Sequence, residues 1–266
     1  MHPSLPQLQK IAIEAAHTGG KVLLRYFRKK IKATEKAGNQ GLVTIADLQS
    51  EKTLIKLFKQ KTPHFGILAE ESGAQSVPDQ NHPPQGRWLI DPLDGTTNFA
   101  HGLPNFCISI AAEWEGQVVV GVIYQPVLNE TYTAMIGKGA FCNKKRLHVS
   151  ATRKLNQSFL STGFSSHKDL YLDSEISTFQ KLSISSNAIR RPGSAAMDLA
   201  NVARGTFDGF WERGLSPWDI AAGSLLITEA GGKVSTLSGQ KLELNSKQIL
   251  ASNGHLHRTL VSEING

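Results

Sequence analysis

The hydrophobic positions near the start of the chain follow the period of an α-helix over residues 5–29. The positions that carry this pattern are Leu8, Ile11, Ala15, Ala16, Gly19, Val22, Leu23, Tyr26 and Phe27. Residues 42–45 form a short extended piece, and a second helix begins at Asp47. Because aspartate is common at helix starts as a cap, Asp47 has a structural explanation as well as a chemical one.

The middle of the chain has the pattern of a β-sheet. Residues 64–69 and the buried run 88–90 are predicted strands. Three further β-rich segments, 106–114, 118–125 and 131–136, are separated by turn residues typical of hairpins. The first half is therefore predicted to pack two helices against a largely antiparallel sheet.

Strand and helix patterns alternate through the second half. The predicted strands are 158–162, 187–190, 206–211, 233–235 and 248–251. The predicted helices are 168–182, 194–203, 217–230 and a terminal helix. Such alternation is typical of an α/β layered fold. Because residues 150–156 carry no periodic signal, we expect an N-terminal α+β half over 1–150 and a C-terminal α/β half over 151–266.

The composition, with 40% hydrophobic and 19% charged residues, is that of a globular protein. The net charge of +7 favours an acidic or phosphorylated partner. The densest basic run is Lys21, Arg25, Arg28, Lys29, Lys30, Lys32 and Lys36. This run is either the solvated end of the first helix or a surface for a polyanion.

Two cysteines, Cys107 and Cys142, lie outside any zinc-binding pattern. The start of the chain lacks the basic and then apolar order of a signal peptide. No stretch approaches the ~18 apolar residues of a membrane span. We therefore expect a cytoplasmic protein without a membrane partner.

Residues 88–99 hold the most chemically informative pattern. The apolar run 88–90 ends in Asp91 and Asp94, with Pro92 between them and Gly95 after them. Carboxylates bind hard divalent cations, and free N–H groups at a helix start bind phosphate. A strand, an acidic turn and a helix start together suit metal-assisted phosphate chemistry. Asp-Pro and Asp-Gly are also common turn formers, so the stretch alone leaves both interpretations open.

Other acids lie where predicted elements begin or end. Glu70 and Glu71 follow the strand at 64–69, where charged side chains are unusual unless they are solvated or bind something. Asp219 lies in the first turn of the helix at 217–230, where a carboxylate also suits the helix dipole. Layered folds open their clefts at such edges, but no argument from the sequence alone shows that these acids lie close together in space.

These motifs resemble those of the inositol monophosphatase family. Three stretches match its signature motifs in order and spacing, namely Glu70–Ser72, Asp91–Phe99 and Trp218–Gly223. Val43–Asp47, with Lys36 upstream, matches an earlier segment of the family. Arg191–Ala196 and Glu212 match its substrate-side segments. The resemblance covers nearly the whole chain, and the string Asp-Pro-Leu-Asp-Gly-Thr-Thr makes it specific.

The resemblance implies an α-β-α-β-α layered sandwich, a homodimer, and a lithium-sensitive phosphoric monoester hydrolase that uses two or three Mg²⁺ ions. The metal ligands that it implies are Glu70, Asp91, the Leu93 carbonyl, Asp94 and Asp219, with Thr96 at the first ion. Asp91 would bridge two ions, and a weaker third ion would lie near Glu70.

The resemblance also assigns roles around the phosphate. Thr96 with Asp47 would orient and activate the attacking water, and Glu70 would be catalytic through its ion, with Lys36 supporting. The substrate-binding residues that it implies are Asp94, Gly95, Thr96, Ser165, Ser194, Ala195, Glu212 and Asp219. The predicted reaction is hydrolysis of a small phosphorylated polyol, myo-inositol monophosphate, to inositol and phosphate by metal-activated water.

Alternatives stay open. Related phosphatases share the metal site, so fructose-1,6-bisphosphate, histidinol phosphate, NADP and a 3′-phosphoadenosine phosphate are alternative substrates. Glu212, seven residues before Asp219, favours an inositol-type hydroxyl contact. A different class is a regulatory protein associated with RNA or transcription on the same fold, suggested by the basic run at 21–36. Steeply salt-dependent RNA binding would support that class.

Overall fold

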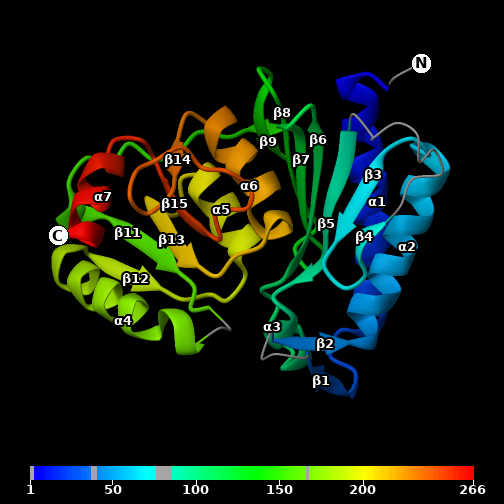
Figure 1. The fold of residues 1–266 in the computed structure, drawn as a ribbon, viewed down its shortest axis with the longest axis horizontal. Coiled ribbons are helices and arrows are strands. Elements are labelled where there is room, and N and C mark those ends of the chain that lie inside the picture. Colours follow the sequence, from blue (N-terminus) through cyan, green and yellow to red (C-terminus); the bar gives the residue numbers. More distant parts are fainter. Residues whose placement is uncertain (1–2, 37–40, 76–85, 166–167) are drawn as a thin grey trace.

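A computed structural model describes residues 3–36, 41–75, 86–165 and 168–266. Five layers follow one another across the molecule: a helix pair, a large sheet, a second helix pair, a smaller sheet and a third helix pair (Figure 1). This arrangement confirms the layered α-β-α-β-α sandwich that the family resemblance implies. Each sheet therefore has helices on both faces, which buries its strands.

The first layer consists of α1, Leu5–Tyr26, and α2, Ile45–Lys61. Both helices cover one face of an eight-stranded sheet in the order β10-β9-β8-β7-β6-β5-β3-β4. Its strands are β3 Gly66–Ala69, β4 Gly73–Gln75, β5 Gly86–Asp94, β6 Cys107–Trp114, β7 Gln117–Gln125, β8 Glu130–Met135, β9 Gly139–Cys142 and β10 Lys145–Arg146. All pairs are antiparallel except β3 with β5, which confirms the largely antiparallel prediction.

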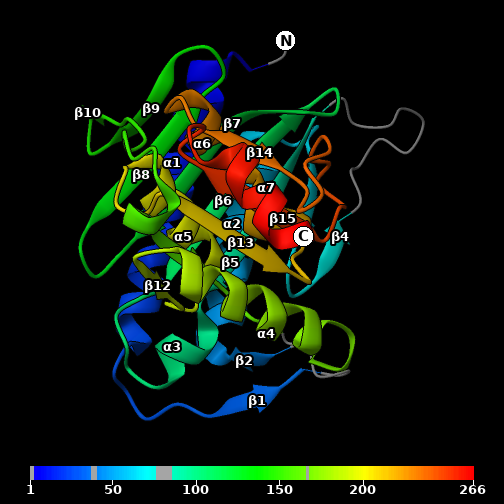
Figure 2. The ribbon, with the colours of Figure 1, turned by 90° about the vertical axis from the view of Figure 1, so that its left-hand side faces the viewer.

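The second sheet has the order β12-β11-β13-β15-β14. Its strands are β11 Phe159–Thr162, β12 Ala188–Arg190, β13 Gly209–Arg213, β14 Lys233–Ser235 and β15 Gln248–Ser252. Figure 2, in which the left-hand side of Figure 1 faces the viewer, shows two helices in front of it, α4 Lys168–Ser185 and α7 His257–Asn265. The strand predicted at 206–211 begins later, at Gly209, and the Asp208 carboxylate just before it accepts a hydrogen bond from the Phe159 N–H of β11.

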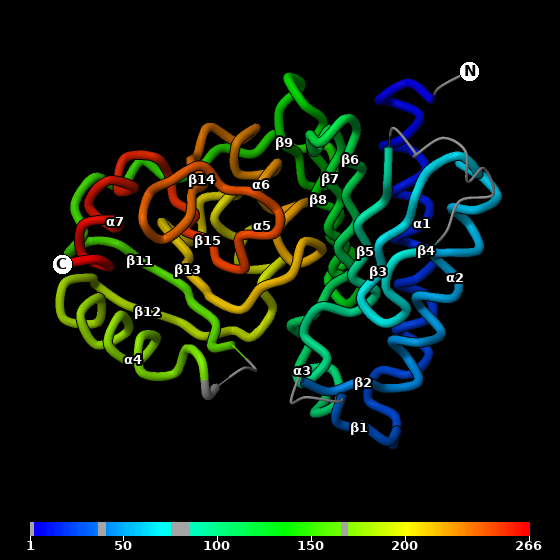
Figure 3. Tube along the Cα trace, viewed as in Figure 1, coloured from blue at the N-terminus to red at the C-terminus, as the bar shows by residue number. Residues whose placement is uncertain are grey.

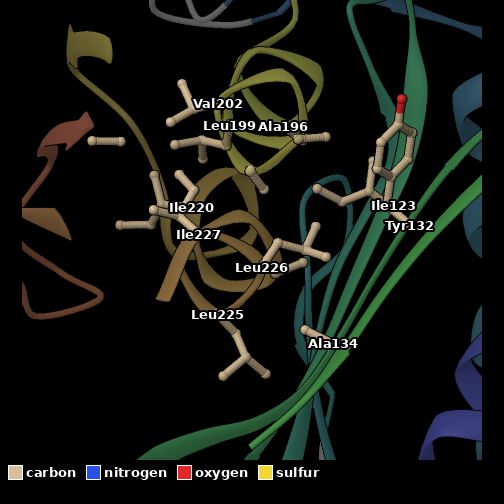
Figure 4. Packing of buried hydrophobic residues seen from close by; sticks show 14 of the residues in the cluster. Ile123, Tyr132, Ala134, Ala196, Leu199, Val202, Ile220, Leu225, Leu226 and Ile227 are labelled. Carbon is tan, nitrogen blue, oxygen red and sulfur yellow. The ribbon is translucent and has the colours of Figure 1, made fainter. Parts of the chain in front are cut away.

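The middle layer consists of α5, Ala195–Ala203, and α6, Pro217–Glu229. Figure 4 shows Ala196 of α5 directed toward Ile123 and Tyr132 of the large sheet, with Val202 on the other side of the helix. These residues belong to one buried cluster that includes side chains from both halves of the chain. The division at residue 150 stays a prediction, and the two halves share this core.

A small element completes the lower end of the molecule. The two-stranded sheet of β1, Ala33–Glu35, and β2, Leu42–Thr44, lies beside the short helix α3, Thr96–Ala100 (Figure 3). A 3-10 turn at Leu155–Gln157 precedes the second sheet. None of the helices in the described part of the chain combines the length and apolar character needed to cross a membrane.

Candidate metal and phosphate site

A β-bulge brings two of the predicted acids to one face of the large sheet. Asp91 pairs with Ser109 and Asp94 with Cys107, so three steps along β5 match two along β6. Side chains alternate between the faces of a strand, so residues three apart would normally point to opposite sides. The extra residue reverses this for the two carboxylates. Pro92, which has no N–H for the ladder, lies within the bulge.

The turn after the bulge is held from several directions. The Leu93 N–H donates to Asp91 Oδ1 over 2.9 Å, and Ser50 Oγ of α2 donates to the Pro92 carbonyl over 3.0 Å. Gly95 begins α3 with a φ of 92°, and a Cβ there would come within 2.9 Å of the Asn105 carbonyl. Only glycine fits this junction without strain.

Four carboxylates from three separate segments interact at this edge. Burial, followed by the charges of Glu70, Asp94 and Asp219, raises the pKa of Asp91 well above its ordinary value. Burial, Glu70 and Asp94 likewise raise the pKa of Asp219. The end of β3, the β5 bulge and the start of α6 therefore converge, which the sequence alone does not require.

Asp94 is held by the segment that begins α5. Its Oδ2 accepts hydrogen bonds from Ser194 Oγ at 2.6 Å and from the Ala196 N–H at 2.7 Å. The buried thiol of Cys107 lies 3.7 Å from the same oxygen. Burial raises the pKa of Asp94, and the hydrogen bonds from Ser194 and Ala196 oppose that rise. Asp94 therefore joins the large sheet to the middle helix layer.

Thr96 and Asp47 form a hydroxyl–carboxylate pair between α3 and α2. Thr96 Oγ1 lies 2.9 Å from Asp47 Oδ1 and 3.0 Å from the Leu93 carbonyl. Asp47 Oδ2 accepts from the N–H of Thr44 at 2.8 Å and from its hydroxyl at 2.6 Å. The N-cap of α2 is therefore Thr44, and Asp47 is its capping-box partner three residues on. One carboxylate oxygen serves the helix and the other serves Thr96.

Lys36 lies against the two acids that follow β3. Its Nζ is 2.6 Å from both Glu70 Oε1 and Glu71 Oε1. Burial lowers the pKa of Lys36, but the charges and hydrogen bonds of the two glutamates outweigh it and raise the pKa overall. Burial and the charge of Glu70 raise the pKa of Glu71 to about 7. Lys36 thus neutralises part of a strongly acidic edge.

The donor chemistry of this edge fits a divalent cation. Its carboxylates raise one another's pKa, so a bound cation would favour their ionised forms. Within residues 3–36, 41–75, 86–165 and 168–266, however, no three His, Cys, Asp or Glu side chains are arranged as a metal site. Glu70 pairs with Lys36, and Asp94 Oδ2 is taken by α5. The ligand set therefore stays a prediction.

The residues predicted to contact the alcohol border the same edge. Ser194 and Ala195 are buried at the start of α5. Ser165 is also buried, and its N–H donates to Glu175 Oε1 over 3.1 Å. The Glu212 carboxylate lies directly against Gly163, where a Cβ would collide with it. Burial, then the charges of Asp219 and Asp94, raise the pKa of Glu212. Glu212 therefore belongs to the same electrostatic neighbourhood as the acid cluster.

The sequence reasoning missed two asparagines that assemble the site. Asn98 Nδ2 is 2.8 Å from the carbonyls of Asn105 and Pro192 and 3.1 Å from that of Gly193. Asn105 Nδ2 also donates to the Pro192 carbonyl over 3.0 Å. These bonds fasten the 191–194 segment to α3. Asn98 stands inside the acidic motif, but no local pattern shows that its partner lies ninety residues away.

Comparison with known proteins finds relatives that match nearly the whole chain. An "Inositol-1-monophosphatase" of Synechocystis sp. is 41% identical over 251 residues, covering 94% of this chain and 86% of that protein. A "Nus factor SuhB" of Escherichia coli is 39% identical over 266 residues, covering 99% and 96%. The crystal structure of the SuhB protein of Bartonella henselae superposes with a TM-score of 0.90 at 37% identity, covering 97% and 98%.

Two more distant structures were determined in the presence of metal ions. A staphylococcal inositol monophosphatase-1 in a LiCl-soaked inhibitory complex superposes with a TM-score of 0.85 at 26% identity, covering 100% of this chain and 97% of that one. An IMPase/NADP phosphatase complexed with NADP and Ca²⁺ matches with the same score and identity, covering 100% and 98%. The sequence pattern that defines the inositol monophosphatase family matches residues 4–266. The chain therefore belongs to the inositol monophosphatase family.

Proposed function

We propose that this protein is a Mg²⁺-dependent phosphatase that hydrolyses myo-inositol monophosphate to inositol and phosphate. The observation that carries the proposal is the cluster of Glu70, Asp91, Asp94 and Asp219, whose charges act on one another at one edge of the fold. Such a cluster suits divalent cations, and membership of the family gives it a reaction.

The metal roles follow the family pattern. Asp91 would bridge two ions, with Glu70 and the Leu93 carbonyl on one side and Asp94 and Asp219 on the other. Mg²⁺ supplies charge for the phosphate oxygens and lowers the pKa of water. Lys36 supports this arrangement by balancing the glutamates when the ion is absent and by releasing Glu70 when it binds.

Thr96 and Asp47 would handle the proton of the attacking water. The single hydroxyl proton of Thr96 can be donated to only one acceptor at a time. When it is donated to Asp47 Oδ1, a lone pair of the Thr96 oxygen is free to accept a proton from water. The Thr44 bonds hold Asp47 in place, so the pair needs no rearrangement to act.

The alcohol would be recognised by the start of α5 and by β13. Ser194 and Ala195 would face the leaving group, together with Ser165, and Glu212 would accept a hydrogen bond from a ring hydroxyl. The N–H groups of Gly95 and Thr96 would contact the phosphate, as helix-start groups do.

Lithium sensitivity, a homodimer and a cytoplasmic location are further parts of the proposal. The ion-bound relatives support the use of cations by this fold. Light scattering after size-exclusion chromatography tests the dimer, and a monomer at micromolar concentration would contradict it.

A substrate panel tests the reaction. Phosphate release is measured at fixed Mg²⁺ with myo-inositol 1-phosphate, fructose-1,6-bisphosphate, histidinol phosphate, NADP and 3′-phosphoadenosine 5′-phosphate. We expect the highest kcat/KM with inositol phosphate, loss of turnover with EDTA, recovery with Mg²⁺, and inhibition by millimolar Li⁺. Preference for another substrate overturns the choice of alcohol, and full activity in EDTA overturns the metal mechanism.

A second candidate is RNA binding, favoured by part of the basic run. Arg28, Lys29 and Lys30 line a shallow cavity of about 470 Å³ together with His101. Lys36, in contrast, turns into the acidic edge, so the run does not form one continuous patch. The names of the SuhB relatives are consistent with a role in transcription.

Salt-dependent binding tests this candidate. We expect a triple Arg28→Ala, Lys29→Ala, Lys30→Ala variant to bind RNA more weakly and with a shallower dependence on salt. A variant lacking the exposed Lys52, Lys56 and Lys59 of α2 removes the same charge elsewhere and serves as the control. Equal binding by both variants, or no binding at low salt, dismisses the candidate.

A further inference from the structure

Asp198 of α5 is a buried acid that the proposed reaction does not use. Its residue exposure is 1%, and neither carboxylate oxygen has a hydrogen-bond partner among the described residues. An unpaired carboxyl in a protein interior is costly, and removing it would ordinarily stabilise the fold. A side chain kept at such a cost calls for a role.

The helical period gives the direction of Asp198. Ala196 points toward Ile123 and Tyr132 of the large sheet (Figure 4). An α-helix turns about 100° per residue, so Asp198 is rotated by about 200° from Ala196. It therefore faces the second sheet, on the same side as Val202.

The face of the second sheet that looks toward α5 carries Glu212. Ser161 of β11 pairs with Phe210 of β13, and Phe210 belongs to the core around α5 and α6. Residues of one register position share a face, and so do residues two apart along a strand. Glu212 and Ser161 therefore face α5. Ser161 Oγ is fully buried and, like Asp198, has no described hydrogen-bond partner.

We propose that Asp198 is a positioning residue that orients the Glu212 carboxylate for the hydroxyl of the substrate. Buried and unpaired, Asp198 is present as the carboxylic acid, which has one O–H to donate. Among the neighbouring acids, Glu212 affects Asp198 most: after burial, Glu212 raises the pKa of Asp198 more than Asp94 does. The donation runs directly after a rotation of the side chain, or through one water molecule.

This role rests on the proposed function, because Glu212 matters only if it contacts an alcohol. Gly163 confines the Glu212 carboxylate from one side, and Asp198 would fix it from the helix side. The ligand is a polyhydroxylated phosphate monoester. A phosphate ester without hydroxyls would not need the contact.

Kinetics on two substrates test the proposal with the full chain and saturating Mg²⁺. The substrates are myo-inositol 1-phosphate and p-nitrophenyl phosphate, which has no hydroxyl for Glu212. We expect Asp198→Ala to raise KM for inositol phosphate about tenfold, the value of one well-placed hydrogen bond, and to leave kcat within about threefold. KM for p-nitrophenyl phosphate stays unchanged. Asp198→Asn, whose amide also donates, restores KM to within about threefold of the wild type.

A double-mutant cycle separates positioning from packing. In a Glu212→Gln background, Asp198→Ala has no further effect on KM if it acts through Glu212. Asp208→Asn alters another buried acid, whose carboxylate is hydrogen-bonded to Ser150 and Phe159. It serves as the control for a loss of stability, which should not change KM for one substrate more than for the other. If Asp198→Ala unfolds the protein, Asp198→Leu takes its place in the cycle, since an apolar side chain suits the buried position.

The outcomes are distinct. Additive effects in the cycle, or equal KM changes for both substrates, overturn the role of Asp198. If the wild type hydrolyses p-nitrophenyl phosphate but not inositol phosphate, the choice of substrate fails instead. The cycle is then repeated with the preferred polyol phosphate of the panel, so that the positioning role is still tested.

Discussion

At the scale of single residues, the site depends on side chains with two simultaneous tasks. Asp47 stabilises the start of α2 with one oxygen and receives Thr96 with the other. Asp94 anchors α5 while remaining part of the acid cluster. Stabilising a helix start is therefore compatible with the proposed chemical role of the same aspartate. Substitutions that remove only one task show which atoms carry the chemistry.

Thr96→Val removes the hydroxyl and keeps the shape. We expect kcat to fall by about 100-fold or more, the usual contribution of a group that helps transfer a proton. The melting temperature should change little, since one partly exposed hydrogen bond contributes about 1 kcal/mol. Thr97→Val is the matched control, because Thr97 is exposed on the same short helix. Equal rates for the two variants would remove Thr96 from the mechanism.

Asp91→Asn keeps the turn and removes the charge. The amide oxygen can still accept from the Leu93 N–H, so the circular dichroism spectrum should be unchanged. We expect kcat/KM to fall more than about 100-fold, because even an outer partner of a metal ligand contributes up to that factor. Asp173→Asn, at an exposed position of α4, is the control. Near-normal turnover by Asp91→Asn with Mg²⁺ would rule out a bridging Asp91.

At the scale of elements, α7 is joined to two strands of the second sheet by one histidine. His257 Nδ1 lies 2.9 Å from Ser252 Oγ of β15, and Nε2 lies 2.9 Å from Ser235 Oγ of β14. Burial, followed by the charge of Lys233, lowers the pKa of His257 to about 4. A neutral imidazole can donate at one nitrogen and accept at the other, which suits two hydroxyl partners.

This junction predicts a dependence of stability on pH. The folded pKa lies below the ordinary value of 6.5, so the unfolded chain binds the proton first as the pH falls. Stability should therefore be full above about pH 6.5 and decrease toward pH 4, by up to about 1.4 kcal/mol per pH unit for one proton. Urea unfolding of the wild type and of His257→Gln across this range measures the difference. Parallel curves for the two proteins would contradict the assignment.

At the scale of the whole molecule, the two sheets are joined through α5 and α6. A Cβ on Gly121 of β7 would come within 2.8 Å of the Ala222 carbonyl in α6, so strand and helix backbones are in direct contact. The core cluster at this interface includes residues on both sides of position 150. The halves therefore depend on each other for burial, and we expect one cooperative unfolding transition.

Gly121→Ala tests this coupling. The added methyl group meets backbone and cannot be relieved by a rotamer change, so we expect a loss of about 1–3 kcal/mol with a single transition kept. Gly209→Ala is the control, since its nearest neighbour is the movable end of Leu260. Calorimetry is combined with fluorescence from variants that keep only Trp88 or only Trp211 of the four tryptophans, so that each sheet is followed separately. Separate transitions for these probes would show that the halves unfold independently.

Much of the architecture follows from local patterns. The long helix from Leu5, the hairpins of β6–β8 and the proline-started helix α6 all lie near their predicted positions. Two boundaries differ from the predicted ones. Helix α1 stops at Tyr26 and β13 begins at Gly209, because local patterns fix the ends of elements less firmly than their existence.

The sequence by itself determined the order of the elements, the layered class and the acidic motifs, because periodicity, turn residues and spacing are local properties. Only the tertiary structure decided which acids meet. The bulge at Pro92 brings Asp91 and Asp94 to one face, and α6 delivers Asp219 from more than a hundred residues away. The surroundings of Asp198 were likewise invisible in the sequence, since burial and the lack of a hydrogen-bond partner are set by contacts between distant segments.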